Sequence, residues 1–214
     1  MLVVIAGGHG KIALLLTELL DSRGDQVRSL IRNPDHAADV SDAGAEPILC
    51  DLETDDVERV AKAVEGADAV VFAAGAGPGS GSERKETMDY GGAVKLIEAA
   101  EEAGVDRYLM ISSIGADPDH AGDETFDVYR RAKGRADREL VESDLAHTIV
   151  KPGSLTDEPA TGKVFASQSG ERGSIPRADV AAVLAACLRE RASVGKAFEV
   201  IAGETPIEAA VAAL

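Results

Sequence analysis

The sequence has 214 residues, of which 38 are acidic and 22 basic, giving a formal charge of −16. A chain of this length can bury the core of one α/β domain without disulfides or a structural metal. Its acidity excludes general attraction to nucleic-acid phosphates and anionic membranes. Cys50 and Cys187 stand in apolar contexts without metal-ligand spacing, and no apolar run approaches the roughly 18 residues of a membrane span. We therefore expect a cytoplasmic protein with no metal site.

Short β-branched runs alternate with longer amphipathic patterns along the chain. Strands are predicted at residues 2–6, 26–31, 46–50, 69–74, 106–112, 147–151 and 197–202. Helices are predicted at 10–23, 55–65, 83–104, 123–144, 177–190 and 206–213, and a glycine-rich loop at 75–82. This alternation predicts an α/β fold with a doubly wound parallel sheet of the Rossmann type, covered on both faces. We expect one domain, 1–214, in which 152–214 completes the sheet and adds a short substrate-side region.

The first predicted strand ends in a glycine-rich turn that leads directly into a helix. Gly7, Gly10 and Ala13 form the pattern G-x-x-G-x-x-A. The first glycine permits a tight turn, the second lets a phosphate approach the backbone, and the small alanine lets helix and strand pack closely. The helix N-terminus then offers free N–H groups to a pyrophosphate. This context favours dinucleotide binding over an ordinary strand-to-helix turn, which is the alternative reading of the pattern.

The end of the second predicted strand indicates which dinucleotide binds. Arg32 follows the glycines by about 20 residues, where an acidic residue is typical of NAD sites and an arginine can accept a 2′-phosphate. Arg28 lies on the same face of that strand. Asp51 and Leu52, after the third strand, suit the amino group and the ring of adenine, although Asp51 is equally suited to cap a helix. The pattern predicts NADP(H) in preference to NAD(H).

A second group of polar residues lies in the far half of the chain. The fifth strand ends at Ser112 and Ser113, and the following helix carries Tyr129 and Lys133 four residues apart. That spacing places phenol and ammonium on one helix face, where the ammonium can stabilise the ionised phenol and contact a nicotinamide ribose. Such a phenol can donate a proton to a carbonyl as hydride arrives, while a serine hydroxyl holds the carbonyl oxygen. The alternative is that all of these are ordinary helix-surface and strand-end residues.

Further motifs are spread over the whole chain. They are Gly-Gly-His-Gly at 7–10, Arg-Asn-Pro at 32–34, Asp-Leu at 51–52, Ala-Ala-Gly at 73–75, Asp-Tyr-Gly-Gly-Ala-Val-Lys-Leu-Ile at 89–97, Gly-Val-Asp-Arg-Tyr at 104–108, Ile-Ser-Ser-Ile-Gly at 111–115, Lys133, and Thr-Ile-Val-Lys-Pro-Gly-Ser-Leu at 148–155. Together they resemble the short-chain dehydrogenase/reductase superfamily, in particular its atypical, NmrA-like NAD(P)H-binding members, which are also similar to epimerase/dehydratase proteins.

The resemblance implies roles for individual residues. Ser113, Tyr129 and Lys133 match catalytic positions. The residues expected to contact the cofactor are Gly7, Gly10, Lys11, Ile12, Arg32, Asp51, Leu52, Ala73, Ala74, Gly75, Lys133 and Pro152. The chain departs from the superfamily's pattern with Phe-Ala-Ala-Gly at 72–75 in place of Asn-Asn-Ala-Gly, and with Lys151 in place of the arginine before Pro-Gly. A lysine keeps the charge of that arginine but not its planar fork.

The expected function is that of an NADP(H)-dependent oxidoreductase acting on a small carbonyl or conjugated substrate. Retention of Tyr129 favours chemistry over the alternative, a non-catalytic NADP(H)-binding redox sensor of the NmrA-like type. A sugar-nucleotide epimerase or dehydratase is disfavoured, because the region after Pro152 is short for a lobe that binds a nucleotide diphosphate. The expected partner is a small-molecule substrate, with no nucleic acid and no membrane, and the expected state is a monomer or weak homodimer.

Overall fold

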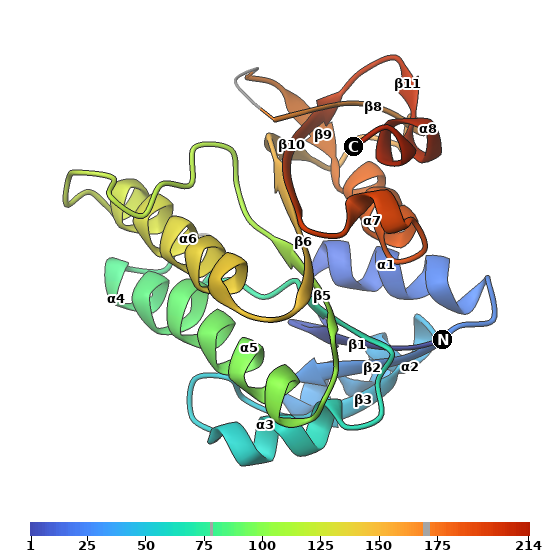
Figure 1. Cartoon of the computed structure of the whole chain (residues 1–214). Helices are drawn as coiled ribbons and strands as arrows, with labels where there is room; N and C mark the ends of the chain where they lie inside the picture. Colours follow the sequence, from blue (N-terminus) through green and yellow to red (C-terminus); the bar gives the residue numbers. More distant parts are fainter. Residues whose placement is uncertain (78, 169–171) are drawn as a thin grey trace.

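A central twisted sheet with helices on both faces organises the protein (Figure 1). The computed structural model describes residues 1–77, 79–168 and 172–214. Pro78, in the expected glycine-rich loop, and residues 169–171, in the expected C-terminal region, lie outside the described residues.

The sheet has the strand order β11-β8-β10-β6-β5-β4-β1-β2-β3. Its parallel part comprises β1 (Leu2–Ala6), β2 (Gln26–Ile31), β3 (Glu46–Leu49), β4 (Ala69–Phe72), β5 (Arg107–Ile111), β6 (Ala146–Pro152) and β10 (Lys196–Ala202). Strand β8 (Lys163–Ser167) runs antiparallel to β10 and to β11 (Thr205–Pro206). A separate parallel pair joins β7 (Ser154–Thr156) and β9 (Ser174–Pro176). From β1 to β3 successive strands are added toward one edge of the sheet, and from β4 onward they are added toward the other edge. The switch point therefore lies between β1 and β4, and doubly wound folds bind their ligands at this point.

Helices cover the sheet in two layers, as Figure 1 shows. One layer contains α1 (Lys11–Asp21) and α7 (Arg177–Cys187), and the other contains α3 (Val57–Val64), α5 (Ala93–Glu102) and α6 (Thr125–Glu142). The remaining helical segments are η1 (Pro34–His36), α2 (Ala37–Asp42), α4 (Ser82–Arg84), the π-helix η2 (Lys85–Gly92), η3 (Arg191–Ser193) and α8 (Ile207–Ala212). The last segments of the chain, β8 to β11 and α8, lie together beyond β6, next to α7.

Alternate residues of the central strands supply two apolar layers. In β1, Val3 and Ile5 pack in the core on the side of α1, together with Leu16, whereas Val4 packs in the core on the side of α5, together with Leu96. All five side chains are fully buried. Because both faces of these strands are covered, the strands are continuous apolar runs rather than alternating ones.

The structure confirms the α/β class, the Rossmann-type sheet and each predicted strand and helix in order, with three differences. The helix predicted at 83–104 is divided into α4, η2 and α5. Strand β8, which was not predicted, runs antiparallel in an otherwise parallel sheet. The short elements η1, α2, β7, β8, β9, β11 and η3 were not predicted, because runs of two to six residues carry too little periodicity to be recognised.

No helix in the described ranges is long and apolar enough to cross a bilayer. Both cysteines are free and buried, and burial raises the thiol pKa to about 11 for Cys50 and about 12 for Cys187. At neutral pH these thiols are protonated, so they act as packing groups rather than as nucleophiles.

Candidate active site

Two adjoining cavities open at the carboxyl ends of β1, β4, β5 and β6. The smaller has a volume of about 440 Å³ and the larger about 850 Å³. Residues 73–77, which follow β4, line both. The cavities therefore form a continuous groove across the switch point of the sheet.

The glycine turn between β1 and α1 forms the floor of the smaller cavity. Gly7 has a φ of +79°, and a Cβ placed there would lie 2.6 Å from Ala74 Cα. A Cβ at Gly8 would lie 2.4 Å from Ser29 Cβ. Only glycine fits at either position, since the first needs a left-handed backbone and both lack space. No side chain caps α1, whose N-cap residue is Gly10, so its first N–H groups are free for a ligand.

Most of the predicted cofactor residues line the groove. The smaller cavity is lined by Gly7, Gly10, Arg32, Asp51, Leu52, Ala73, Ala74 and Gly75, and the larger by Ile12, Ala73, Ala74, Gly75, Lys133 and Pro152. Lys11 lines neither cavity. Its exposed side chain donates a hydrogen bond to Asp157 (2.6 Å).

Two arginines flank the far end of the smaller cavity. Arg32 Nη1 lies 3.4 Å and Arg84 Nη2 2.9 Å from the same carboxylate oxygen of Glu53. Burial raises the pKa of Glu53, but hydrogen bonds from Arg84 and Thr87 outweigh it and hold the pKa below its usual range. Arg84 was not predicted, because only the tertiary fold brings it to a strand end 52 residues away in sequence. Because the two guanidinium groups share one carboxylate, this end of the cavity keeps a positive charge that suits a phosphate.

Asp51 does not cap a helix. Its Oδ1 accepts a hydrogen bond from the backbone of Glu53 (2.9 Å) within a turn, whereas Asp56 caps α3 by accepting from the backbone of Arg59 (2.8 Å). The helix-capping interpretation of Asp51 is therefore wrong. Its carboxylate lies at the wall of the smaller cavity, beside Leu52.

The predicted catalytic residues all line the larger cavity. Tyr129 and Lys133 come from α6, and Ser113 from the segment after β5. The Ser113 hydroxyl donates to the carbonyl of Ile114 (3.2 Å). The Tyr129 hydroxyl has no hydrogen-bond partner in the described parts of the chain, and the Tyr129 ring stacks against Phe126.

Lys133 is held in a buried ion pair. Its side chain is 5% exposed, and its Nζ lies 3.4 Å from Asp89 Oδ1 and donates to the carbonyl of Ile111 (3.1 Å). Asp89, which is 2% exposed, also accepts from the backbone N–H of Ala76 (3.2 Å). The Lys133 ammonium is thus fixed by Asp89 and Ile111, and no hydrogen bond joins it to Tyr129 in the described residues. Asp89 belongs to the π-helix η2, whose widened turn the sequence pattern did not reveal.

A second, partly buried ion pair joins β6 to α6. Lys151 Nζ lies 2.8 Å from Asp137 Oδ2, one turn beyond Lys133. Burial raises the pKa of Asp137, while Lys151 opposes that rise. Lys151, which stands in place of the superfamily's arginine before Pro-Gly, is therefore paired with a carboxylate of the protein itself.

The described residues contain no group of three or more His, Cys, Asp or Glu side chains arranged to hold a metal ion. Among other groups, the groove thus offers glycine backbone, the guanidinium groups of Arg32 and Arg84, a phenol, a serine hydroxyl and a buried lysine. This set suits a phosphorylated dinucleotide bound next to a proton donor.

Comparison with known proteins is consistent with this geometry. Residues 7–191 match the NAD(P)H-binding family. The chain belongs to that family. This NAD(P)H-binding protein is 38% identical over 212 residues to a Bacillus subtilis (strain 168) protein named uncharacterized sugar epimerase YhfK, with 99% of each chain covered.

Two solved structures are also similar to this NAD(P)H-binding protein. One, from Bacillus halodurans and provisionally named an NAD-dependent epimerase/dehydratase, is 39% identical with a TM-score of 0.92 and full coverage of both chains. The other is ChuY, an anaerobillin reductase from Escherichia coli O157:H7, which is 25% identical with a TM-score of 0.78 over 95% of this chain and 98% of that one. The predicted resemblance to oxidoreductases and to epimerase/dehydratase proteins is confirmed.

Proposed function

We propose that the protein is an NADP(H)-dependent oxidoreductase that reduces a small carbonyl or conjugated substrate. One observation carries the proposal. Ser113, Tyr129 and Lys133 line one cavity, and that cavity adjoins the cavity lined by the glycine turn. The similarity to ChuY, whose name describes a reductase, supports the reaction class.

The residues of the groove fit a dinucleotide. A Cβ would fill the space above Gly7 and Gly8, and the free N–H groups at the start of α1 suit a pyrophosphate. Arg32 and Arg84 would hold a 2′-phosphate, Leu52 would cover the adenine, and Lys133 with Pro152 would contact the nicotinamide half. When bound, NADPH supplies a hydride to the substrate.

The side chains of the larger cavity provide the proton and the orientation. Tyr129 donates its hydroxyl proton to the carbonyl oxygen as the carbonyl carbon is reduced. Ser113 turns its hydroxyl from the Ile114 carbonyl to the same oxygen and stabilises the developing charge. Lys133, fixed by Asp89, presents a positive charge beneath the reacting atoms and favours the phenolate that remains. Ile12 and Pro152 add apolar wall that excludes water.

Cofactor preference follows from Arg32 and provides a first test. The parent protein is expected to bind NADPH more tightly than NADH, because a charge-assisted contact to the 2′-phosphate contributes about 1.5–3 kcal/mol. Arg32→Asp should reverse the order. Arg28→Asp is the matched control, since Arg28 lies in β2, which Arg32 directly follows, and pairs with Glu46 outside both cavities. Calorimetric titration decides the matter, and equal affinities in the parent would defeat the assignment of Arg32.

The activity itself is tested by following NADPH oxidation by the purified protein with aldehydes, ketones, quinones and flavins. The proposed function predicts oxidation with at least one class of these compounds. A redox sensor would bind NADPH without oxidising it. This alternative is supported by the ion pair between Lys133 and Asp89, which occupies the ammonium that the reductase would use. A sugar-nucleotide epimerase is suggested by the names of relatives, and inversion of nucleotide sugars with no net NADPH consumption would support it.

A further inference from the structure

The larger cavity is positively charged although the whole chain carries a formal charge of −16. Among the described residues that line it, the only carboxylate is that of Asp89. The cationic side chains are Lys85, Arg130, Lys133, Arg172 and Arg177. A cavity lined by one sign of charge concentrates ligands of the opposite sign.

Two of these cations are already neutralised within the fold. Lys133 pairs with Asp89, and Arg177 donates to Asp157 (2.7 Å). The other three have no carboxylate within 4.0 Å in the described parts of the chain. Within the described residues, Lys85 donates to the carbonyl of Gly77 (3.1 Å), and its Nζ lies 5.4 Å from the centre of the Tyr129 ring. The cavity therefore keeps positive charge that no directly contacting carboxylate of the described residues balances.

Arg130 is the most firmly positioned of the three. Its guanidinium lies 4.7 Å from the centre of the Phe126 ring and packs over Gly115, where a Cβ would lie 3.5 Å from Nε. Arg130 Nε is buried and has no hydrogen-bond partner among the residues that the structure describes. Asp127, three residues earlier on α6, is hydrogen-bonded to His120 (2.8 Å) and attracts Arg130 only at longer range. The planar guanidinium, held in place by Phe126 and Gly115, suits a planar, two-oxygen acceptor such as a carboxylate.

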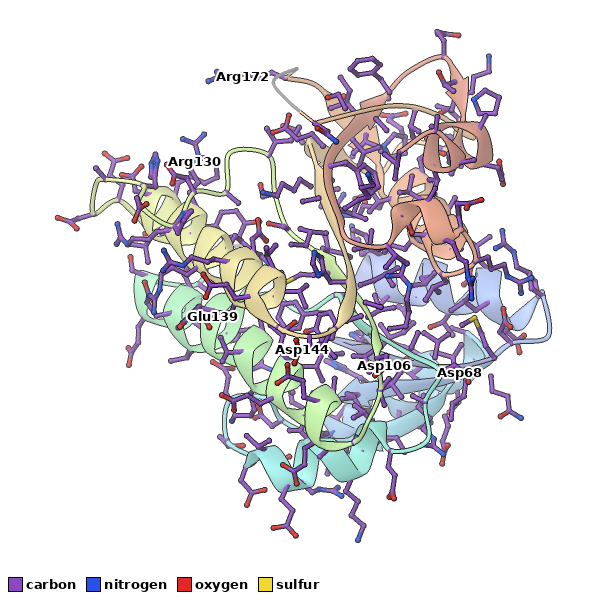
Figure 2. All side chains as sticks on the ribbon, viewed as in Figure 1. Asp68, Asp106, Arg130, Glu139, Asp144 and Arg172 are labelled. Atoms are coloured by element: carbon purple, nitrogen blue, oxygen red, sulfur yellow. The ribbon has the colours of Figure 1, made fainter. Side chains whose placement is uncertain are left out.

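The mouth of the cavity adds an apolar, aromatic wall. Phe126 is 57% exposed and its ring stacks on Tyr129 with 5.9 Å between centroids and 22° between planes. Leu155, after β6, is 36% exposed and also lines the cavity. In Figure 2, Arg130 on α6 and Arg172 beside β9 lie on the same side of the molecule, and both line this cavity. Exposed aromatic and aliphatic surface next to unbalanced cations matches an aromatic acid.

We propose that the larger cavity takes a flat, conjugated substrate that bears a carboxylate. Arg130 binds the carboxylate, and the conjugated body lies against Phe126 and Leu155 with its reducible group toward Tyr129. Lys85 and Arg172 add positive charge that attracts the carboxylate, whereas Arg130 sets the carboxylate's position. The identification of this ligand as the substrate rests on the proposed function, whereas the carboxylate site itself does not.

The test measures binding rather than turnover. Calorimetry on the full chain saturated with NADP⁺ compares 2-naphthoate with 2-naphthalenemethanol, which has the same rings and no charge. We expect the naphthoate to bind about tenfold more tightly, as one charge-assisted contact implies. Arg130→Gln should remove that advantage and leave the affinity for the alcohol within about twofold. Arg130→Lys, which keeps the charge without the fork, should retain part of it. Arg138→Gln, an exposed arginine of α6 outside the cavity, is the matched control.

Equal affinity of the parent for the two compounds would overturn the proposal. So would an unchanged naphthoate affinity in Arg130→Gln, with circular dichroism confirming the fold of each variant. The proposed function fails separately, because absence of NADPH oxidation with intact naphthoate preference would leave the carboxylate site standing and remove only its role in catalysis.

Discussion

Tyr129→Phe is expected to lower turnover about 100-fold or more while leaving NADPH affinity nearly unchanged. The substitution removes only the hydroxyl, and a positioned proton donor typically contributes that factor. The ring that stacks on Phe126 is retained, so the cavity wall is preserved. Steady-state kinetics with the substrate found by NADPH oxidation, together with calorimetric titration of NADPH, measures both quantities.

Tyr90→Phe is the matched control for this prediction. Tyr90 lies in η2, its hydroxyl donates to Glu139 (3.1 Å), and it lines neither cavity. Its loss should leave turnover within about twofold of the parent, since no reacting group is touched. Parent-level turnover in Tyr129→Phe would remove Tyr129 from the mechanism.

Lys133→Met is expected to lower the free energy of unfolding by roughly 3–5 kcal/mol and to abolish turnover. Removing the ammonium leaves the carboxylate of Asp89 buried without its ion partner, and breaking a buried pair from one side has an effect of this size. Urea denaturation measures the loss of stability. Lys163→Met is the comparison, because the Lys163–Glu204 pair is exposed and an exposed pair contributes about 0–1 kcal/mol.

The double variant Lys133→Met, Asp89→Asn separates stability from function. Asparagine removes the unpaired charge and still offers an oxygen to the Ala76 backbone N–H. We expect most of the lost stability to return while turnover stays absent, since the ammonium beneath the reacting atoms is still missing. A double variant that turns over like the parent would show that Lys133 has only a structural role.

The parts of the site that depend on local sequence could be predicted, and those that depend on tertiary approach could not. The Gly7 turn was predictable because strand, turn and helix are contiguous, and the same holds for Tyr129 and Lys133 on one face of α6. Arg130 was within reach too, one residue after Tyr129, but nothing in a helical pattern tells a cavity-lining arginine from a solvated one.

Asp89 illustrates the limit most clearly. A regular α-helix over 83–104 was predicted from periodicity, yet residues 85–92 form a π-helix that carries Asp89 into the groove beneath Lys133. A one-residue change in helical phase cannot be recognised in a pattern of 3.6 residues per turn. Three short strands after β6 were missed for a different reason. Strands β7, β9 and β11 are two or three residues long and are fixed by their partners rather than by their own sequence.

The most direct test of the central claim is deuterium transfer in a single turnover. Purified protein is loaded with NADPH deuterated at C4, in the 4R or the 4S position, and mixed with an aldehyde or ketone that supports NADPH oxidation. The account predicts that one of the two labelled cofactors delivers deuterium to the former carbonyl carbon, and that transfer in Tyr129→Phe is about 100-fold slower. Tight NADPH binding with no deuterium in the product from either cofactor would contradict the reductase and leave the protein as a sensor.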